Sequence, residues 1–198
     1  MQRRITVATM LLGLLALAGC VSEPPQTPQD DRGELVYGRY RYQTDQFTGV
    51  TRVTYWSFFF PPDSDFGRAD VVLSWGTDST EYLMTFDLIE GDWLFVDQVL
   101  YLVGDQTGRL GPSGFRRDVL QGGSVWERLF VPLSDEQLAF FQTDEPIQFS
   151  LRGSGGRKDV VMDDRFQVML RRIVAAREFI DAGQPIPDEL FEGFRRTD

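Results

Sequence analysis

Residues 50–60 read VTRVTYWSFFF, and this run of β-branched and aromatic residues predicts a long β-strand. Apolar side chains recur at every second position in residues 70–75, 81–89 and 125–131, and most regularly in residues 147–151. A period of two places the apolar residues on one face, which is typical of half-buried strands. The middle of the chain is therefore predicted to form β-sheet.

The links between these strands contain turn residues. Glu90, Gly91 and Asp92 separate residues 81–89 from a further apolar run at 93–103, so we expect these two runs to pair as a hairpin. Residues 104–114 are rich in glycine and are predicted to form a loop between strands. A second glycine-rich segment, residues 153–156, is expected to join the last strand to a helix.

Two helices are predicted in the second half of the chain. Ser134 and Gln137 have the spacing of a capping box, which predicts a short helix near residues 134–141. Asp163 or Asp164 caps a longer helix near 164–182, and Gly183 ends it. The apolar residues of this helix recur at helical spacing and predict a core-facing stripe: Phe166, Met169, Leu170, Ile173 and Ile180.

Together these patterns predict an α+β fold. We expect an antiparallel sheet or sandwich of about six to seven strands with helical cover, because strands come first and the long helix follows them. The chain lacks the βαβ alternation of a parallel sheet and any repeat of solenoid length.

Composition excludes several kinds of chemistry. The chain has no histidine and one cysteine, which rules out Ser-His-Asp triads, thiolate zinc sites and intrachain disulfides. A Schiff-base mechanism would depend on Lys158 alone. The formal net charge is −10, so nucleic acid is not an expected partner.

The first twenty residues carry a targeting signal. Arg3 and Arg4 precede an apolar run over residues 5–18, which is too short to span about 30 Å of hydrocarbon. Leu17, Ala18, Gly19 and Cys20 close this run. These four residues resemble the lipobox of bacterial lipoproteins. The resemblance implies cleavage before Cys20 and a diacylglyceryl group, often joined by a further acyl chain such as palmitate, on that cysteine.

The lipobox implies three segments. Residues 1–19 would be the cleaved signal peptide, residues 20–33 the lipidated cysteine with a flexible Pro- and Gln-rich tether, and residues 34–198 a globular domain. Val21 follows the cysteine where an aspartate would favour inner-membrane retention in enteric bacteria. We therefore expect a protein of the cell envelope, anchored in the outer membrane and facing the periplasm.

Acidic residues, glycine-rich segments and aromatic residues are the remaining candidates for a site. The acidic residues have local reasons to lie at turns and helix starts, and none has the spacing of a calcium loop. Residues 104–111 lack the Lys-Ser/Thr of a phosphate-binding loop, and residues 153–156 could bind an anion with Arg157 and Lys158. The acidic candidates are Asp63, Asp65, Asp87, Glu90, Asp92, Asp97, Asp163 and Asp164; the aromatic ones are Tyr55, Trp56, Phe58, Phe59 and Phe60.

We assign no catalytic, cofactor-binding or metal-ligating residue from these patterns. The preferred hypothesis is a non-catalytic lipoprotein, attached to the membrane through Cys20, whose domain binds an envelope protein or helps to assemble an envelope structure. One alternative is a carrier or sensor of an apolar ligand in a β-walled pocket lined by aromatic rings. Another is a hydrolase with two carboxylates about 5–10 Å apart in a cleft.

Overall fold

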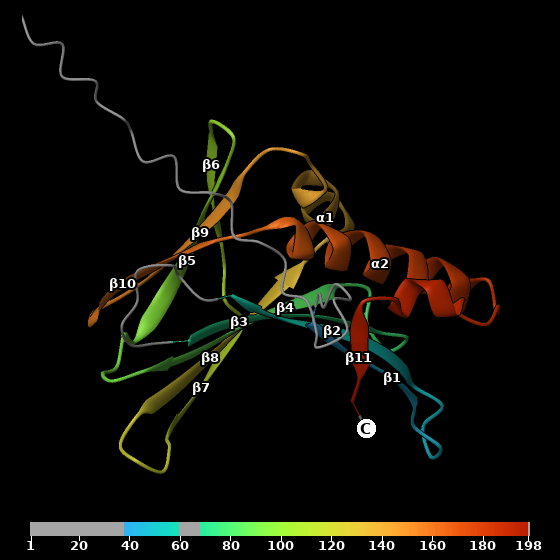
Figure 1. Ribbon diagram of the computed structural model, residues 1–198, viewed down its shortest axis with the longest axis horizontal. Coiled ribbons are helices and arrows are strands. Elements are labelled where there is room, and N and C mark those ends of the chain that lie inside the picture. Colours follow the sequence, from blue (N-terminus) through green and yellow to red (C-terminus); the bar gives the residue numbers. More distant parts are fainter. Residues whose placement is uncertain (1–37, 60–67, 198) are drawn as a thin grey trace, which may run out of the picture.

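The computed structural model describes residues 38–59 and 68–197, which form two β-sheets and two α-helices (Figure 1). Neighbouring strands are antiparallel throughout, except that β1 and β11 are parallel. The large sheet has the order β11 (Phe194–Arg196), β1 (Gly38–Thr44), β2 (Thr51–Phe59), β3 (Arg68–Gly76), β4 (Tyr82–Glu90), β8 (Val125–Leu133), β7 (Gly114–Val119). The small sheet has the order β10 (Gly156–Val161), β9 (Ile147–Gly153), β5 (Val96–Val103), β6 (Gln106–Leu110).

The α+β class is confirmed, but the expected six to seven strands were too few. The six apolar runs became β2, β3, β4, β5, β8 and β9, and five further strands are present in the described part of the chain. These additional strands are mostly exposed: β1, β6, β7, β10 and β11. Period-two apolar patterning could not reveal them, because their hydrogen bonds rather than buried side chains hold them in the sheets.

The core lies between three layers. One face of the large sheet, here called the inner face, packs against the small sheet and against α2 (Asp164–Asp181) (Figure 1). The Phe86 ring of β4 contacts the Phe149 ring of β9 edge to face, with centroids 5.2 Å apart. Phe149 makes a similar contact with Phe166 of α2 at 5.8 Å. These rings therefore fill the space where the two sheets and the helix meet.

The predicted hairpin between residues 81–89 and 93–103 is wrong. β4 pairs with β3 and β8 in the large sheet, whereas β5 pairs with β6 and β9 in the small one. The chain crosses between the sheets over residues 91–95, where Phe95 has a positive φ of 50°. The buried carboxylate of Glu127 accepts hydrogen bonds from the backbone N–H groups of Leu94, Phe95 and Val96 and so fixes this crossing.

The glycine-rich segments are also parts of hairpins rather than long loops. Residues 104–105 turn the chain from β5 into β6, and β7 already begins at Gly114. Residues 153–156 join β9 to β10, not to a helix, and Gly156 has a positive φ of 143°. The glycines permit tight turns, which a composition-based prediction cannot distinguish from longer loops.

Both helix predictions are confirmed. Ser134 and Gln137 form the reciprocal capping box at the start of α1 (Asp135–Phe141). Asp163 caps α2, accepting from the backbone N–H of Arg165 at 3.0 Å. Gly183, with φ of 65°, follows the end of α2. The predicted stripe faces the core, with Phe166, Met169, Leu170 and Ile173 fully buried and Ile180 partly buried.

After α2 the chain returns to the large sheet. A short 3-10 helix, η1 (Asp188–Phe191), precedes β11, which pairs with β1. Phe191 stacks on Tyr40 of β1 with ring centroids 4.2 Å apart. The two ends of the described chain therefore lie side by side at one edge of the large sheet (Figure 1).

A candidate binding groove on the outer face of the large sheet

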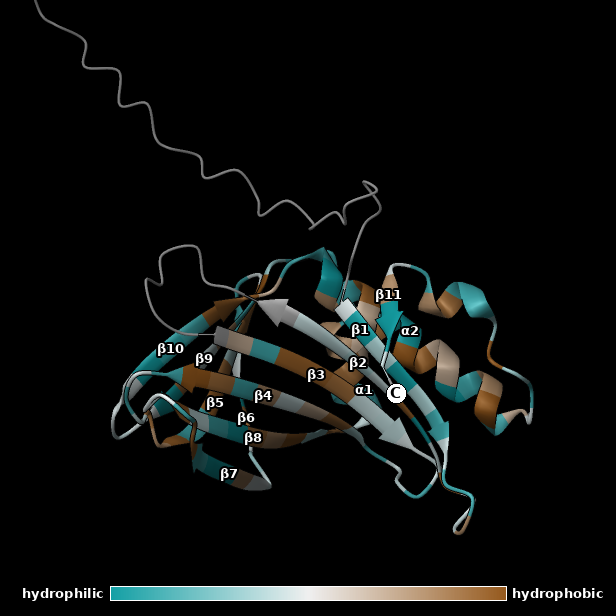
Figure 2. Cartoon of the chain, turned by 60° about the horizontal axis from the view of Figure 1, so that its bottom comes forward, coloured by the Kyte–Doolittle hydropathy of each residue, from teal (hydrophilic) through white to brown (hydrophobic). Residues whose placement is uncertain are grey.

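The face of the large sheet that points away from the small sheet, its outer face, carries a groove of about 600 Å³. The long strands β2, β3, β4 and β8 lie side by side beneath it as one curved sheet (Figure 2). Side chains alternate along each strand, so neighbours of the groove residues belong to the core. Thr54 and Trp56, for example, flank the fully buried Tyr55.

Apolar side chains from four strands contribute to the floor of the groove. Register places Trp56 of β2 opposite Val72 of β3, and Leu83 of β4 opposite Pro132 of β8. Phe130 of β8 adds a further ring. These five residues are here called the apolar strip, in which Thr85 stands between Val72 and Phe130. Apolar side chains on a sheet face outside the core are expected where the sheet meets a partner rather than water.

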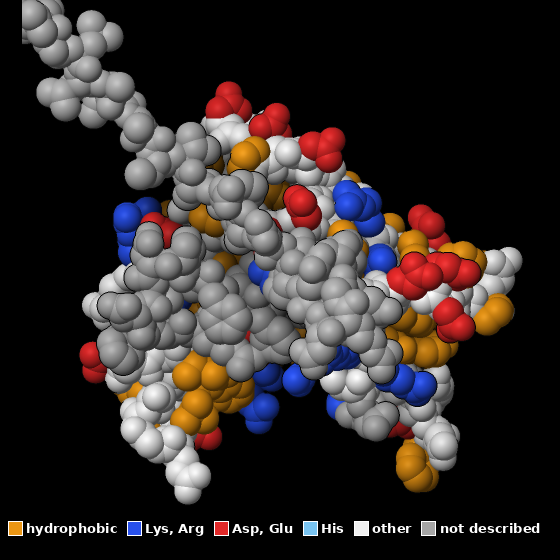
Figure 3. Space-filling view, viewed as in Figure 1, with side chains coloured by type: hydrophobic (Ala, Val, Ile, Leu, Met, Phe, Trp, Pro, Cys, Tyr) orange, Lys and Arg blue, Asp and Glu red, His pale blue; other side chains and the backbone are white. Residues whose placement is uncertain are grey.

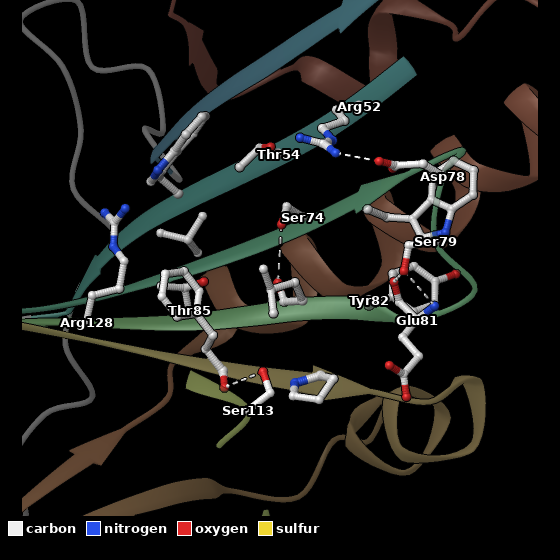
Figure 4. A pocket seen from close by; sticks show the side chains of 17 residues that line it. Arg52, Thr54, Ser74, Asp78, Ser79, Glu81, Tyr82, Thr85, Ser113 and Arg128 are labelled. Carbon is white, nitrogen blue, oxygen red and sulfur yellow. Dashed lines mark hydrogen bonds and ion pairs between the residues drawn. The ribbon is translucent and has the colours of Figure 1, made fainter. Parts of the chain in front are cut away.

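Hydroxyl groups lie among the apolar side chains. Thr54, Ser74 and Thr85 point into the groove from three adjacent strands (Figure 4). Ser74 Oγ lies 3.5 Å from the carbonyl oxygen of Leu83. Each hydroxyl can both donate and accept, so a bound molecule could satisfy polar groups of its own on this surface.

An arginine–aspartate pair stands at each end of the groove. At one end Arg52 Nη2 contacts Asp78 Oδ2 at 2.6 Å, and both side chains are exposed (Figure 4). At the other end Arg128 binds both carboxylate oxygens of Asp87, at 2.5 and 2.6 Å. The hydrogen bond to Asp87 raises the pKa of Arg128, which remains charged.

Two acidic residues lie on neighbouring strands beyond the Arg128 end of the groove. Asp70 of β3 lies directly opposite Asp87 of β4, and both are largely buried. However, Arg128 already occupies both oxygens of Asp87, and its guanidinium also lies over the ring of Trp126, 4.8 Å from the centroid. Neither Asp70 nor Asp87 lines the groove, so the geometry favours binding over hydrolysis.

The acidic residues singled out from the sequence do not form one site. Asp87 lies on the outer face of β4 without lining the groove, whereas Glu90, three residues further along β4, pairs with Lys158 on the other side of the sheet. Asp92 and Asp97 are exposed. Asp163 caps α2 and pairs with Arg165, and Asp164 lies in the first turn of that helix.

The glycine-rich segments do not come together as an anion site either. Lys158 is engaged by Glu90, and Arg157 lies 3.4 Å from Asp159. Among the aromatic candidates, Tyr55 lies in the core and Trp56 lines the groove, on opposite faces of β2. Asp63, Asp65 and Phe60 lie outside the described residues, and the side chains of Phe58 and Phe59 are not described.

Three charged residues that the sequence did not single out are central to the structure: Arg128, Glu127 and Arg117. Glu127 is 3% exposed and accepts from Arg117 Nε at 3.2 Å in addition to three backbone N–H groups. Their partners lie on other strands or in the crossing at residues 91–95, 10 to 41 residues away in sequence. The only local signal was two adjacent charges, Glu127 and Arg128, inside an apolar strand.

The lipobox residues Leu17, Ala18, Gly19 and Cys20 lie outside the described residues. Within the described ranges, no helix is long and apolar enough to cross a membrane. The same ranges contain no group of three or more acidic, histidine or cysteine side chains placed to hold a metal ion.

Comparisons with protein-family models, with curated proteins and with solved structures give no match for this chain.

Proposed function

We propose that this protein is a membrane-anchored lipoprotein of the cell envelope whose domain binds a protein partner in the groove on the outer face of the large sheet. The observation that carries the proposal is the apolar strip of Trp56, Val72, Leu83, Phe130 and Pro132 on a sheet face that does not form the core. Lipid on Cys20 would hold the domain beside the outer membrane, facing the periplasm.

The chemistry of the groove indicates what kind of partner surface it fits. Apolar side chains would lie on the central strip, hydroxyl groups would meet backbone or side-chain polar groups, and the paired charges at Arg52 and Arg128 would border the contact. Apolar and hydroxyl side chains bordered by charged pairs are found together in protein–protein interfaces. An extended segment of the partner would lie in the groove across β2, β3, β4 and β8.

The packing of the interior supports this proposal over a carrier of an apolar ligand. A carrier needs an enclosed cavity lined by rings, but Phe86, Phe149 and Phe166 pack against one another between the sheets. Tyr55 is likewise engaged, its ring against Phe194 and its hydroxyl donating to the carbonyl of Leu190 at 3.1 Å. The side chains that would line such a cavity therefore fill the space themselves.

A photo-crosslinking amino acid in the groove tests the binding proposal. Placed at Leu83 in the full chain in cells, it should give a discrete adduct with an envelope protein after irradiation. The same residue at Leu102, on the exposed face of the small sheet, should not give that adduct.

Two matched substitutions then show whether the adduct depends on the groove. Ser74→Arg fills the groove and should abolish the adduct at position 83. Ser150→Arg adds the same side chain to the outer face of the small sheet and should leave the adduct intact. Equal adducts at positions 83 and 102, or an adduct that survives Ser74→Arg, would show that the groove is not the binding site.

Metabolic labelling with a fatty-acid analogue tests the anchor separately. The parent chain should carry the label and fractionate with the outer membrane, and Cys20→Ser should lose both properties. Label that persists in the Cys20→Ser chain would refute attachment at this residue.

A further inference from the structure

β7 forms one edge of the large sheet, and in the described part of the chain only β8 pairs with it. It lies at the periphery of the molecule in two different views (Figures 1 and 2). The strand reads GFRRDV, and five of its six residues are exposed. An exposed edge strand presents backbone donors and acceptors that another chain can pair with.

The pairing of β7 with β8 determines which backbone groups remain available. The N–H of Leu120 donates to the carbonyl of Ser124 at 2.7 Å, which continues the β7–β8 register beyond the strand. In an antiparallel ladder, such hydrogen-bonded positions alternate with positions whose N–H and C=O point the other way. Phe115, Arg117 and Val119 therefore direct their backbone groups away from β8. Consistent with this, the N–H of Val119 bonds only locally, to the carboxylate of Asp118 at 2.8 Å.

The charged residues on one face of β7 lack a balancing partner within the described structure. Arg116 lies directly opposite Arg128 of β8, and like charges in this position repel each other. Arg128 is neutralised by Asp87, whereas Arg116 has no ion pair among the described residues. Two positions along the same face, the Asp118 carboxylate accepts a hydrogen bond from the Val119 N–H and has no ion pair among the described residues.

The other face of β7 is apolar and exposed. Phe115 is 42% exposed, Val119 61% and the neighbouring Phe95 46%. The guanidinium of Arg117 lies over the rings of Phe115 and Phe95, 5.1 and 5.5 Å from their centroids. Figure 3 shows hydrophobic side chains beside basic ones in the region of β7 and β8. This surface combines open backbone groups, unburied rings and unbalanced charges.

We propose that β7 pairs with β7 of a second copy of this chain, antiparallel and with the two Arg117 residues opposite each other. Phe115 of each copy then lies opposite Val119 of the other, at positions whose backbone groups point outward and can form hydrogen bonds. Arg116 of each copy lies opposite Asp118 of the other. These are non-hydrogen-bonded positions, where cross-strand side chains are closest.

This register is the one that the sequence of β7 favours. It yields two Arg–Asp pairs and two Phe–Val pairs by symmetry, and the two large sheets become continuous. A shift of two residues in either direction keeps the backbone geometry but places Arg116 opposite Arg116, or Asp118 opposite Asp118. Both shifted registers bring like charges together and lose the two Arg–Asp pairs. The register centred on Arg117 also places two arginines opposite each other, but each Arg117 is already paired with Glu127 of its own chain, so charge favours this register.

A six-residue strand buries little surface, so the isolated dimer should be weak and readily reversible. Two-dimensional confinement by the lipid on Cys20 would raise the effective concentration of the two copies, a step that rests on the proposed anchor. The strand pairing itself does not depend on the anchor, since its contacts lie entirely within β7 and its neighbours.

Charge exchange tests the pairing. In the full chain purified in detergent, sedimentation equilibrium should detect a dimer. Arg116→Asp and Asp118→Arg should each raise the dimer dissociation constant by about tenfold or more, because each variant places two like-charged pairs in the interface. The double variant, Arg116→Asp with Asp118→Arg, restores both opposite-charge pairs and should return the dissociation constant to within about threefold of the parent value.

Arg109→Asp is the matched control, since Arg109 is an exposed arginine on β6, at the edge of the small sheet. This variant should dimerise like the parent, and near-UV circular dichroism verifies that every variant is folded. A chain that stays monomeric at all concentrations overturns the proposal, as does a dimer unaffected by the single exchanges or not restored by the double one. The Cys20→Ser chain should still dimerise at high concentration, which tests the strand pairing without the lipid anchor. Failure of the cross-link in the groove would not affect the dimerisation measurement, because the two experiments probe different surfaces.

Discussion

At the scale of single residues, Glu127 is held by an unusually complete set of hydrogen bonds. Its carboxylate is almost fully buried, and four N–H donors from two segments of chain converge on it. A buried charge is costly unless its hydrogen-bonding capacity is met, and here backbone and guanidinium groups meet it. Glu127 also holds Phe95 at a positive φ, a conformation that is rare for a bulky residue.

Replacement of Glu127 by glutamine should therefore be strongly destabilising. The amide group would turn donors toward donors, and Arg117 would lose its counter-charge. We expect the free energy of unfolding, measured by urea denaturation, to fall by about 2–4 kcal/mol. Glu136→Gln, at an exposed position in the first turn of α1, is the control and should change it by less than about 0.5 kcal/mol. Equal effects for the two variants would contradict the role assigned to Glu127.

Tyr55 links stability to high pH. Burial raises the pKa of its hydroxyl well above the ordinary value, so above about pH 10 the unfolded chain loses this proton while the folded chain retains it. The contribution of Tyr55 is therefore fully present below pH 10 and is lost as the pH rises further. Tyr55→Phe should lower the free energy of unfolding by about 1 kcal/mol at pH 7, because it removes the hydrogen bond from the Tyr55 hydroxyl to the carbonyl of Leu190.

Above pH 10 the difference in the free energy of unfolding between the parent chain and Tyr55→Phe should shrink. The reason is that the variant has no hydroxyl at this position to ionise in the unfolded state. The measurement is a series of denaturation curves between pH 7 and about pH 12. If the free energy of unfolding depends on pH in the same way in both proteins, Tyr55 is not the group that links stability to high pH.

At the scale of elements, short-range capping explains why α1 forms where it does. The helix has only seven residues, too few to be stable alone, yet Ser134 and Gln137 satisfy two of its free N–H groups. Leu138 and Phe141 then bury its apolar side. Local hydrogen bonds fix where the helix begins, and packing stabilises it.

Ser134→Ala removes one half of the capping box. We expect a loss of about 1 kcal/mol in the free energy of unfolding, as is usual for an N-cap serine. Ser154→Ala, in the exposed turn between β9 and β10, is the control and should have little effect. Thermal unfolding of both variants in parallel would distinguish them, and an unchanged midpoint for Ser134→Ala would show that packing alone holds α1.

At the scale of the whole molecule, the protein depends on the junction of its three layers. Phe149 contacts Phe86 of the large sheet, Phe166 of α2 and Phe141 of α1, so one side chain connects four elements. No disulfide can form in a chain with a single cysteine. The hydrophobic core must therefore hold the described domain together without cross-links.

Phe149→Ala should lower the free energy of unfolding by about 3–5 kcal/mol, because it leaves a cavity between both sheets and the helices. Phe47→Ala is a control of the same chemistry, since Phe47 is 99% exposed. Chemical denaturation monitored by tryptophan fluorescence would measure the free energy of unfolding of both variants. A small effect of Phe149→Ala would mean that the layers are held together elsewhere.

Signals within a few residues of one another were enough to determine part of this protein from its sequence. Capping residues located both helices, and apolar periodicity located β2, β3, β4, β5, β8 and β9, because caps and amphipathic faces are local properties. The lipobox prediction for Cys20 is local too and stays a prediction. None of these signals states which strand lies beside which.

Tertiary structure alone decided the rest. β7 and β11 are strands because a neighbouring strand supplies their hydrogen bonds, and the groove exists because Trp56, Leu83 and Phe130 meet on one face. Arg128 and Glu127 acquired their roles only when β8 was placed beside β4 and β7. The physical reason is that strand pairing joins residues far apart in sequence, so its energy is a property of partners that no local stretch of sequence contains.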